Sequence, residues 1–337
     1  MKLLFDHPSP FLLAHGGFQT QIEQTKAALE GLGVEVEYLR WWDDRQTGNI
    51  IHYFGRPSGG YIDFAHGKGM KVVVGELHTG LASRPGWQRL LQKQIMRTAQ
   101  FALPHAFTAK LAWEAYQKAD AFIALTDWEK HLMVAMFDAD PAKVHVIPNG
   151  VEEVFFLPPS VVRRPSSDYL VSTATITPRK RVLELAQAAV LAQVPVWIIG
   201  KPYAESDPYH QRFLETVRAS AGIVKYEGGI SDRKRLAEIY QKARGFVLLS
   251  SMESLSLSAL EASASGCPLL LADLPWARSS FGNAATYVPA KTTPEATAKH
   301  LLTFYHAAPD HHHTPIAHSW PVIAQKFKSL YEQLLVG

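Results

Sequence analysis

Short runs of apolar residues, many of them β-branched, alternate along this chain with longer segments in which apolar residues recur every three or four positions. A run of the first kind predicts a strand buried on both faces of a parallel sheet, and a segment of the second kind predicts an amphipathic helix. In the first half the predicted strands are Lys2–Asp6, Val34–Leu39, Ile50–Phe54, Lys71–Glu76, Ala121–Leu125 and Val144–Pro148, and the clearest helices are Thr20–Gly31 and Trp128–Phe137.

A second alternating series begins after a stretch rich in Pro, Ser and Arg that follows Asn149-Gly150. Its predicted strands are Tyr169–Thr173, Val194–Ile199, Ile223–Tyr226, Gly245–Leu249, Pro268–Ala272 and Ala285–Val288. Its predicted helices are Arg181–Leu191, Tyr209–Ala221, Asp232–Lys242, Leu257–Ser265 and Pro294–His306.

Two such series predict an α/β protein of two Rossmann-like, doubly wound domains that face each other across a ligand cleft. We expect the first domain over residues 1–155 and the second over 156–317. A last helix, predicted over Val322–Leu335 within residues 318–337, is expected to pack back on the first domain.

The composition suits two ordinary globular cores, since 47% of the 337 residues are hydrophobic. The 34 basic and 31 acidic residues leave a net charge of +3, which argues against a nucleic-acid partner. One cysteine, Cys267, excludes a disulfide framework and fits a reducing cytosol. Asp6, His7, Pro8 and Pro10 interrupt the N-terminus and no run reaches about 18 apolar residues, so we expect a cytoplasmic protein without signal peptide or membrane span.

The most specific chemical feature is a pair of carboxylates eight residues apart, Glu253 and Glu261. Glu253 follows the predicted strand Gly245–Leu249, and Glu261 lies about one turn inside the next predicted helix. Free N–H groups at the start of that helix attract a phosphate, and a carboxylate there accepts hydrogen bonds from the vicinal hydroxyls of a ribose or a hexose. On spacing alone, two solvated acids at a helix end are the better explanation.

The residues around this pair change that interpretation. The run resembles the Glu-x7-Glu motif of retaining glycosyltransferases of the GT-B fold in family 4, also called glycosyl transferases group 1. The matching residues are Ser250, Glu253, Leu257, Glu261, Ala262, Ala264, Gly266 and Pro268. The resemblance implies that Glu253 contacts the transferred sugar and Glu261 the nucleotide ribose. It also implies that N–H groups from about Leu255 to Leu257 hold the diphosphate, in a loop where Ser256 and Ser258 replace the family's usual Gly and Pro.

Further matches follow in family order over roughly residues 1 to 290. Gly16-Gly17 resembles the family's N-terminal glycine loop, where absent Cβ atoms let the backbone approach the donor, although a simple turn would explain the pair equally well. The run Val146–Val151 resembles the family's domain-end signature. His78, after the apolar run Lys71–Leu77, stands where the family often places a histidine beside the transferred sugar, although a strand-end histidine needs no such role.

The departing nucleoside diphosphate must be stabilised by positive charge. The family supplies an arginine and, about five residues later, a lysine; Lys180 matches the lysine, but Thr175 stands in place of the arginine. Arg179 or Arg181 could supply the missing charge, or both could be surface residues. With cations and N–H dipoles converging on the diphosphate, the resemblance implies no obligatory metal.

Lys201 and the loop Gly228-Gly229 occupy places where the family often contacts the nucleotide base, although connecting loops use the same residue types. Two other patterns are better explained without a metal ion. Asp138-Ala139-Asp140 lies in a predicted helix-to-strand turn, where Asp serves as a cap. His311-His312-His313 are consecutive loop residues that cannot all face one ion without strain.

The segment 84–110 is basic and lies in a stretch without Asp or Glu from Leu77 to Trp113. On a helix from Trp87, three basic residues recur every four positions, and apolar residues cluster on another face. The basic residues are Arg89, Lys93 and Arg97, and the apolar ones are Trp87, Leu90, Leu91 and Ile95. Such a helix could dock on anionic lipid as a peripheral contact at the inner membrane face; packing of its apolar face on the domain is the favoured alternative.

The resemblance implies a retaining glycosyltransferase that moves a sugar from a nucleoside-diphosphate sugar to a hydroxyl acceptor. Two other functions stay open at this point. The first is a nucleotide-sugar epimerase on the same fold, and the second is a nucleotide-sugar-binding pseudoenzyme, which Thr175, Ser256 and Ser258 would favour.

Overall fold

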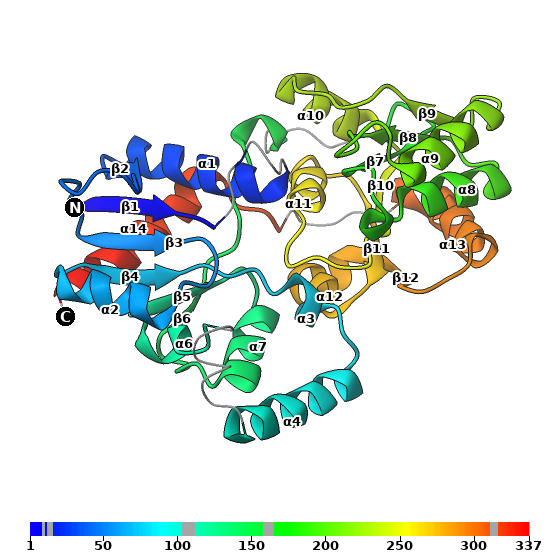
Figure 1. The fold of residues 1–337 in the computed structure, drawn as a ribbon. Helices are drawn as coiled ribbons and strands as arrows, with labels where there is room; N and C mark the ends of the chain where they lie inside the picture. Colours follow the sequence, from blue (N-terminus) through cyan, green and yellow to red (C-terminus); the bar gives the residue numbers. More distant parts are fainter. Residues whose placement is uncertain (9–10, 12–15, 103–111, 158–164, 311–315, 337) are drawn as a thin grey trace. The chain divides into compact units, whose positions relative to one another are not determined.

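A computed structural model describes residues 1–8, 11, 16–102, 112–157, 165–310 and 316–336, which form two compact units (Figure 1). Unit 1 comprises Met1–Gly150 and Trp320–Gly337, and unit 2 comprises Val151–Ser319. Each unit contains one parallel sheet of six strands with helices packed against it. The predicted α/β class with two Rossmann-like sheets is therefore confirmed.

Unit 1 has the strand order β2-β1-β3-β4-β5-β6. Its strands are β1 (Lys2–Asp6), β2 (Glu35–Tyr38), β3 (Ile50–Tyr53), β4 (Lys71–Val74), β5 (Ala121–Ala124) and β6 (Val144–Val146). Its helices are α1 (Gly17–Gly31), α2 (Gly59–Gly67), α3 (Thr79–Ala82), α4 (Gly86–Ala102), α6 (Ala115–Lys118), α7 (Asp127–Phe137) and α14 (Trp320–Val336). Because side chains alternate along a strand, Leu4 and Ile51 share a core with α2, α6 and α7, whereas His52 faces α14.

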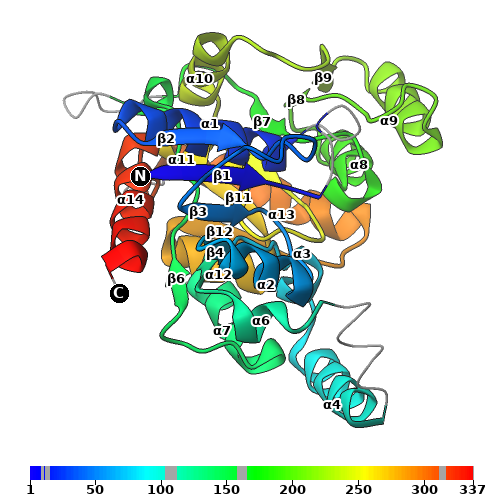
Figure 2. The ribbon, with the colours of Figure 1, turned by 60° about the vertical axis from the view of Figure 1, so that its left-hand side comes forward.

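The C-terminal helix α14 belongs to unit 1 and packs against α1, beside which it lies in Figures 1 and 2. Its Tyr331 hydroxyl lies 2.7 Å from Nδ1 of the buried His52. Gly150 contacts the start of this helix so closely that a Cβ on it would lie 2.7 Å from the Trp320 Cα. The glycine of the domain-end signature is therefore needed for the helix to return here.

Unit 2 has the strand order β12-β11-β10-β7-β8-β9. Its strands are β7 (Leu170–Thr173), β8 (Val196–Ile199), β9 (Val224–Tyr226), β10 (Gly245–Leu248), β11 (Leu269–Asp273) and β12 (Ala285–Pro289). Its α-helices are α8 (Val182–Ala192), α9 (Pro208–Ala219), α10 (Arg233–Lys242), α11 (Leu257–Ala264), α12 (Pro275–Phe281) and α13 (Pro294–Ala307), and short 3-10 turns include η1 (Glu153–Phe155) and η2 (Pro178–Lys180). Helix α8 packs against α9 and α13, and α10 packs against α11.

The strand order of unit 2 reverses at β7, since β8 lies on one side of β7 and β10 on the other. The loops that leave the carboxyl ends of β7 and β10 therefore diverge, and such a reversal is where open α/β sheets bind ligands. Lys180 follows β7 and Glu253 follows β10. In unit 1 the reversal lies between β1 and β3, and Gly16-Gly17 follow β1.

The predicted strands all have counterparts whose ends differ by at most two residues. The longer run Lys71–Leu77 is not one strand, because β4 ends at Val74 and Glu76 turns away to pair with Arg56. The sequence did not predict α2, α6 and α12, whose 9, 4 and 7 residues hold too few turns for a clear apolar period. Within the described residues, no helix is both long and apolar enough to span a bilayer.

Candidate active site

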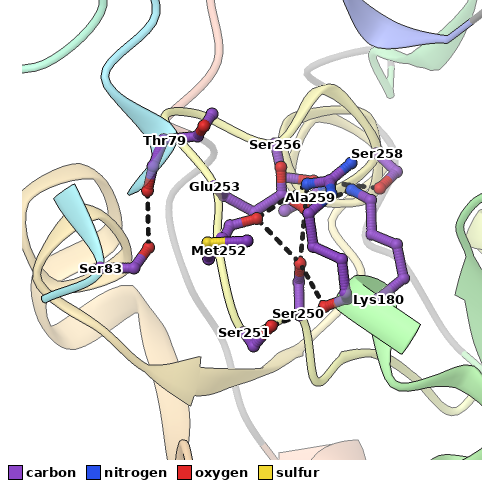
Figure 3. A network of polar contacts seen from close by, with 11 residues as sticks. Thr79, Ser83, Lys180, Ser250, Ser251, Met252, Glu253, Ser256, Ser258 and Ala259 are labelled. Carbon is purple, nitrogen blue, oxygen red and sulfur yellow. Dashed lines mark hydrogen bonds and ion pairs between the residues drawn. The ribbon is translucent and has the colours of Figure 1, made fainter. Parts of the chain in front are cut away.

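Glu253 lies at the centre of a polar cluster at the strand-order reversal of unit 2 (Figure 3). Lys180 Nζ and Ser250 Oγ both donate to Glu253 Oε1, the latter at 2.7 Å, and Arg179 Nη1 lies 3.3 Å from the same oxygen. Glu253 is only 7% exposed, so the alternative of a solvated helix-end acid is wrong for it. Burial lowers the pKa of Lys180, while the charge of Glu253 opposes that shift.

The turn η2 and the loop after β10 are tied together by their backbones. Ser251 donates from its N–H and from its hydroxyl to the Arg179 carbonyl, at 2.8 and 3.0 Å. The Arg179 guanidinium donates to the Met252 carbonyl at 2.8 Å. Arg181 takes a different direction, because its left-handed backbone (φ 54°) sends its guanidinium to the carbonyls of Ala290 and Thr292. Of the two arginines considered as a replacement for Thr175, Arg179 alone reaches this cluster.

Helix α11 begins beside Glu253, and its first turn is capped by the two serines that distinguish this loop. Ser256 Oγ accepts a hydrogen bond from the Ala259 N–H at 3.3 Å and lies 3.1 Å from Ser258 Oγ. Figure 3 shows both serines near Glu253. The N–H groups of Leu257 and Ser258 have no helical acceptor, because they belong to the first turn of α11. An anion near this turn would meet two N–H groups and the positive end of the helix dipole.

Glu261, one turn further along α11, is held by a residue that the sequence did not indicate. Arg233 donates to Glu261 Oε1 and, at 2.7 Å, to Glu152 Oε1, and its guanidinium lies 4.6 Å from the centroid of the Phe155 ring. Glu261 is 7% exposed, so it is not a solvated acid either. Burial raises the pKa of Glu261, and Arg233 opposes that rise. Arg233 lies 28 residues from Glu261, and no local pattern signals such a pair.

Thr175 and Lys201 lie at the ends of β7 and β8. The Ile176 N–H, next to half-buried Thr175, donates to the Lys201 carbonyl at 3.1 Å. Gly200 permits this approach, because its φ is 155° and a Cβ there would lie 1.8 Å from the Ala174 carbonyl oxygen. The stem of Lys201 crosses Gly229, where a Cβ would lie 3.0 Å from Lys201 Cε. In the described part of the chain, no hydrogen bond or ion pair joins Thr175 or Lys201 to Glu253.

His78 lies in unit 1, four residues after β4 rather than at a strand end. Its Nε2 is 3.1 Å from the hydroxyl of Tyr116, which donates to Glu76 Oε2 at 2.5 Å. The His78 N–H donates to Glu129 Oε1 at 3.0 Å. Burial lowers the pKa of His78, and the charges of Glu76 and Glu129 oppose that shift. Tyr116, Glu76 and Glu129 carry no motif that could have connected them with His78.

Gly16 and Gly17 begin helix α1. Gly16 has a φ of 139°, a conformation that residues with a Cβ rarely adopt, and its carbonyl accepts the N–H of Thr20 at 3.2 Å. Among the described residues, no side-chain hydrogen bond caps this end of α1. Within the described residues, the first N–H groups of α1 have no side-chain acceptor, an arrangement in which a helix N-terminus can bind an anion.

The sequence favoured a helix α4 that packs its apolar face on the domain, and that prediction is wrong. Its apolar side chains face solvent, and the exposed ones are Trp87 (66%), Leu90 (68%), Leu91 (55%) and Ile95 (59%). Met96 and Ala99 contact the core of unit 1 instead, and the Arg89 guanidinium lies 4.2 Å from the centroid of the Trp128 ring. Both Figures 1 and 2 show α4 projecting from the rest of unit 1. Residues 103–110 of the basic segment lie outside the described residues.

The two metal-like patterns differ in what the structure describes. Asp138 ends α7 in the left-handed conformation, and Asp140 Oδ1 accepts the Ala142 N–H at 2.9 Å, so both are turn residues. His311–His313 lie outside the described residues. Within the ranges that the structure describes, no three His, Cys, Asp or Glu side chains are grouped to hold a metal ion.

Comparison with known sequences identifies relatives for each part of the chain. The family model of Glycosyl transferases group 1 matches residues 157–316, and that of Glycosyltransferase Family 4 matches residues 36–154. D-inositol 3-phosphate glycosyltransferase 2 of Catenulispora acidiphila is 32% identical over 185 residues, which are 49% of this chain and 43% of that relative. D-inositol 3-phosphate glycosyltransferase of Actinosynnema mirum is 32% identical over 176 residues, 46% of this chain and 41% of that relative. The match therefore spans less than half the length of these relatives.

Solved structures with the same fold cover nearly the whole chain. Sucrose-phosphate synthase from Thermosynechococcus elongatus has a TM-score of 0.69 at 18% identity, over 99% of both chains. HepE from Anabaena, solved in complex with UDP, has a TM-score of 0.63 at 15% identity, over 99% of this chain and 98% of its own. At these identities the likeness shows the fold alone. The two family models, which match successive parts of the chain, show that it belongs to the GT-B fold glycosyltransferases of family 4, the glycosyl transferases group 1.

Proposed function

We propose that this chain transfers a sugar from a nucleoside-diphosphate sugar to a hydroxyl acceptor with retention of the anomeric configuration. The observation that carries the proposal is the convergence of Lys180 and Arg179 on Glu253 beside the first turn of α11. Two cations and free helix N–H groups are what a departing diphosphate requires. Because these groups follow β7 and β10, where the strand order reverses, unit 2 would bind the donor.

Arg179 would replace the arginine that the family has at the position of Thr175. In this proposal the diphosphate takes the positive charge of Arg179 and Lys180, which Glu253 holds in the absence of donor. The carboxylate of Glu253 is then released to accept a hydroxyl of the transferred sugar. Glu261 would accept a ribose hydroxyl, and Lys201 beside Gly229 would contact the base.

The reaction needs no covalent nucleophile. The bond between the anomeric carbon and the β-phosphate oxygen breaks, and its electron pair leaves with the nucleoside diphosphate. The acceptor oxygen attacks the same face through an oxocarbenium-like state, and its proton passes to the departing phosphate. His78 of unit 1 would contact the carbohydrate, and Gly16-Gly17 would offer N–H groups to the donor. Because Lys180 and Arg179 supply the charge, transfer is expected to persist in EDTA.

The first experiment is a thermal-shift screen with UDP-, GDP-, ADP- and dTDP-sugars, in which a ligand of the folded state raises the melting temperature. The donor found is then mixed with hydroxyl acceptors, beginning with D-inositol 3-phosphate because the curated relatives are named for it. Release of nucleoside diphosphate only with an acceptor supports the proposal. Conversion of the donor sugar without acceptor would identify an epimerase, and donor binding without any release would identify a pseudoenzyme.

The role of Arg179 has its own test. Arg179→Gln should weaken nucleoside-diphosphate binding by about tenfold, because one charge-assisted hydrogen bond is lost, and Arg179→Lys should restore part of it. Binding of the nucleoside without phosphates should be equal in all three proteins. Unchanged diphosphate affinity in Arg179→Gln would show that Thr175 has no replacement at this position.

We also propose that the outward face of α4 docks on anionic lipid. Support comes from three apolar residues that are more than half exposed, Trp87, Leu91 and Ile95. Further support comes from the charge of the stretch Leu77–Trp113 that contains α4, which has basic but no acidic residues. A second copy of the chain fits less well, because two such cationic helices would repel each other.

Vesicle sedimentation tests this surface. The wild type should sediment with vesicles of phosphatidylglycerol and phosphatidylcholine and stay in solution with phosphatidylcholine alone. Leu91→Gln/Ile95→Gln should abolish sedimentation. The control variant Phe64→Gln changes a highly exposed hydrophobic residue of a different helix, α2, and should sediment like the wild type. Equal sedimentation of both variants, or a dimer that Leu91→Gln/Ile95→Gln disrupts, would overturn the lipid proposal.

A further inference from the structure

His78 is the meeting point of a polar network that links four parts of unit 1. The network contains Arg56 after β3, Glu76 after β4, Tyr116 of α6 and Glu129 of α7. Its inner members are almost inaccessible: Glu129 is 0% exposed, Tyr116 2% and His78 4%. A buried network of this kind fixes protons as well as atoms, because each donor must be matched with an acceptor.

The protons of the network can be assigned from its geometry. Arg56 donates two parallel hydrogen bonds to the Glu76 carboxylate, at 2.7 and 2.8 Å, and the paired carboxylate then serves only as an acceptor. Tyr116 has one hydroxyl proton and donates it to Glu76 Oε2 at 2.5 Å. Burial and the nearby Glu76 charge raise the pKa of Tyr116 well above its ordinary value, so the hydroxyl keeps that proton.

The Tyr116 hydroxyl also accepts a hydrogen bond from the Arg56 guanidinium, which can only donate, and it lies 3.1 Å from His78 Nε2. Because the tyrosine proton already points to Glu76, the oxygen can only accept here, and Nε2 must carry the imidazole proton. In neutral imidazole the other nitrogen, Nδ1, then has a free lone pair. Within the described part of the chain, Nδ1 has no hydrogen-bond partner.

The ring of His78 is also held against rotation. Its backbone N–H donates to Glu129 Oε1, while Glu129 Oε2 accepts the Leu125 N–H at 2.8 Å. The imidazole stacks on Phe137, with ring centroids 5.1 Å apart and planes inclined by 26°. A 180° flip of the ring would put Cε1 where Nε2 now lies and would leave the Tyr116 hydroxyl oxygen without that partner.

We propose that Tyr116 and Glu76 are positioning residues that lock His78 as the Nε2–H tautomer, so that Nδ1 accepts a hydrogen bond from a hydroxyl of the carbohydrate substrate. The second half of this statement rests on the proposed glycosyltransferase function, and the first half does not. The charged groups that face His78 are Arg56, Glu76 and Glu129. A neutral imidazole with a free lone pair on Nδ1 can accept a hydrogen bond from a sugar hydroxyl. An imidazolium has no such lone pair, and its positive charge would repel an oxocarbenium-like centre.

The tautomer is measurable without any substrate. The chain labelled with 15N-histidine is studied by long-range 1H–15N correlation at neutral pH, and the His78 signal is assigned with His78→Asn. A protonated Nε2 and a bare Nδ1 are expected in the wild type. Tyr116→Phe should remove this preference, giving mixed or exchanged tautomers, while the signal of His52 stays unchanged.

Tyr331→Phe is the matched control, because it deletes the hydroxyl that contacts Nδ1 of the equally buried His52. It should change the His52 signal and leave that of His78 as in the wild type. A protonated Nδ1 or a charged imidazolium at His78 in the wild type would overturn the inference. So would a His78 tautomer that is the same in Tyr116→Phe and the wild type.

A kinetic experiment separates this inference from the proposed function. Tyr116→Phe should lower kcat about tenfold, the equivalent of one hydrogen bond, with nucleoside-diphosphate affinity unchanged because neither Tyr116 nor His78 is among the groups proposed to hold the diphosphate. An Nε2–H tautomer in a chain that transfers no sugar would support the lock and overturn the proposed function. Sugar transfer with equal kcat in Tyr116→Phe and the wild type would overturn the role of Nδ1 and leave the proposed function standing.

Discussion

Replacement of Lys180 by methionine tests both the stability of the Glu253 cluster and its proposed role. The side chains of Lys180 and Glu253 are 12% and 9% exposed. Loss of one member of a buried ion pair typically costs 3–5 kcal/mol, because the remaining charge stays buried without its partner; since Arg179 and Ser250 still contact Glu253, we expect about 3 kcal/mol. Methionine matches the length of the lysine stem and leaves no large cavity.

The double variant Lys180→Met/Glu253→Gln should recover most of that stability. It removes both charges together, and replacement of a whole buried pair by neutral groups is often nearly neutral, so we expect a difference of about 1 kcal/mol or less from the wild type. Glutamine can still accept the hydroxyl of Ser250, which keeps that hydrogen bond. The free energy of unfolding is measured for all three proteins by urea denaturation, followed by circular dichroism.

Affinity for the nucleoside diphosphate should not recover with stability. The double variant still lacks a cation, and loss of one charge-assisted hydrogen bond to a phosphate corresponds to about tenfold or more in Kd. Titration calorimetry with the nucleoside diphosphate measures this directly. If Lys180→Met is as stable as the wild type, the buried ion pair is wrongly assigned; if the double variant binds like the wild type, Lys180 does not hold the diphosphate.

Three further predictions concern Glu261, His52 and Gly200. Glu261→Ala should weaken donor binding about tenfold in calorimetry, because the acceptor for the ribose hydroxyls is lost, and wild-type affinity would contradict that role. Burial lowers the pKa of His52 to about 3 from an ordinary 6.5. Between about pH 3 and 6.5 the unfolded chain therefore binds more protons than the folded chain, and through this group the free energy of unfolding should fall by about 2 kcal/mol from pH 8 to pH 5. In His52→Leu the free energy of unfolding should depend less on pH by that amount. The same pH dependence in both proteins, measured by urea titration, would refute the prediction. Gly200→Ala should cost about 3 kcal/mol or more, since its Cβ would meet the Ala174 carbonyl, while Gly60→Ala, which meets nothing within 4 Å, should be nearly neutral in the same assay; equal stability of both would contradict the close approach.

The sequence predicts the sheets well because their signal is local. A buried parallel strand is a continuous apolar run, and the run Gly245–Leu249 contains the observed strand Gly245–Leu248. Residues that directly follow such strands lie at the carboxyl edge of the sheet, independently of how the helices pack. The predicted strands place Glu253 and Lys180 at that edge, and the family resemblance is what marks both as candidate site residues; a hydrogen bond joins their side chains in the structure.

Partners that are distant in the chain could not be predicted in this way. Arg233 and Glu261 come from different helices, and Tyr116 reaches His78 from a helix of four residues that has no recognisable period. Helix α4 shows a related limit, because an apolar stripe predicts that a helix face avoids water without indicating what covers it. Met96 and Ala99, between its apolar and basic residues, make the contact with the core instead.

The substitution of the family arginine by Thr175 shows why charge must be judged in space rather than at an aligned position. Successive residues of an extended strand point to opposite sides, whereas η2 is a tight turn whose long side chains can converge. Arg179 and Lys180 therefore reach the same carboxylate oxygen, although the family separates its two cations by several residues. Arg181, only one residue further, is in the left-handed conformation and binds the carbonyls of Ala290 and Thr292. The loss of an aligned arginine thus gives little support to a pseudoenzyme, because a second cation is already present beside Glu253.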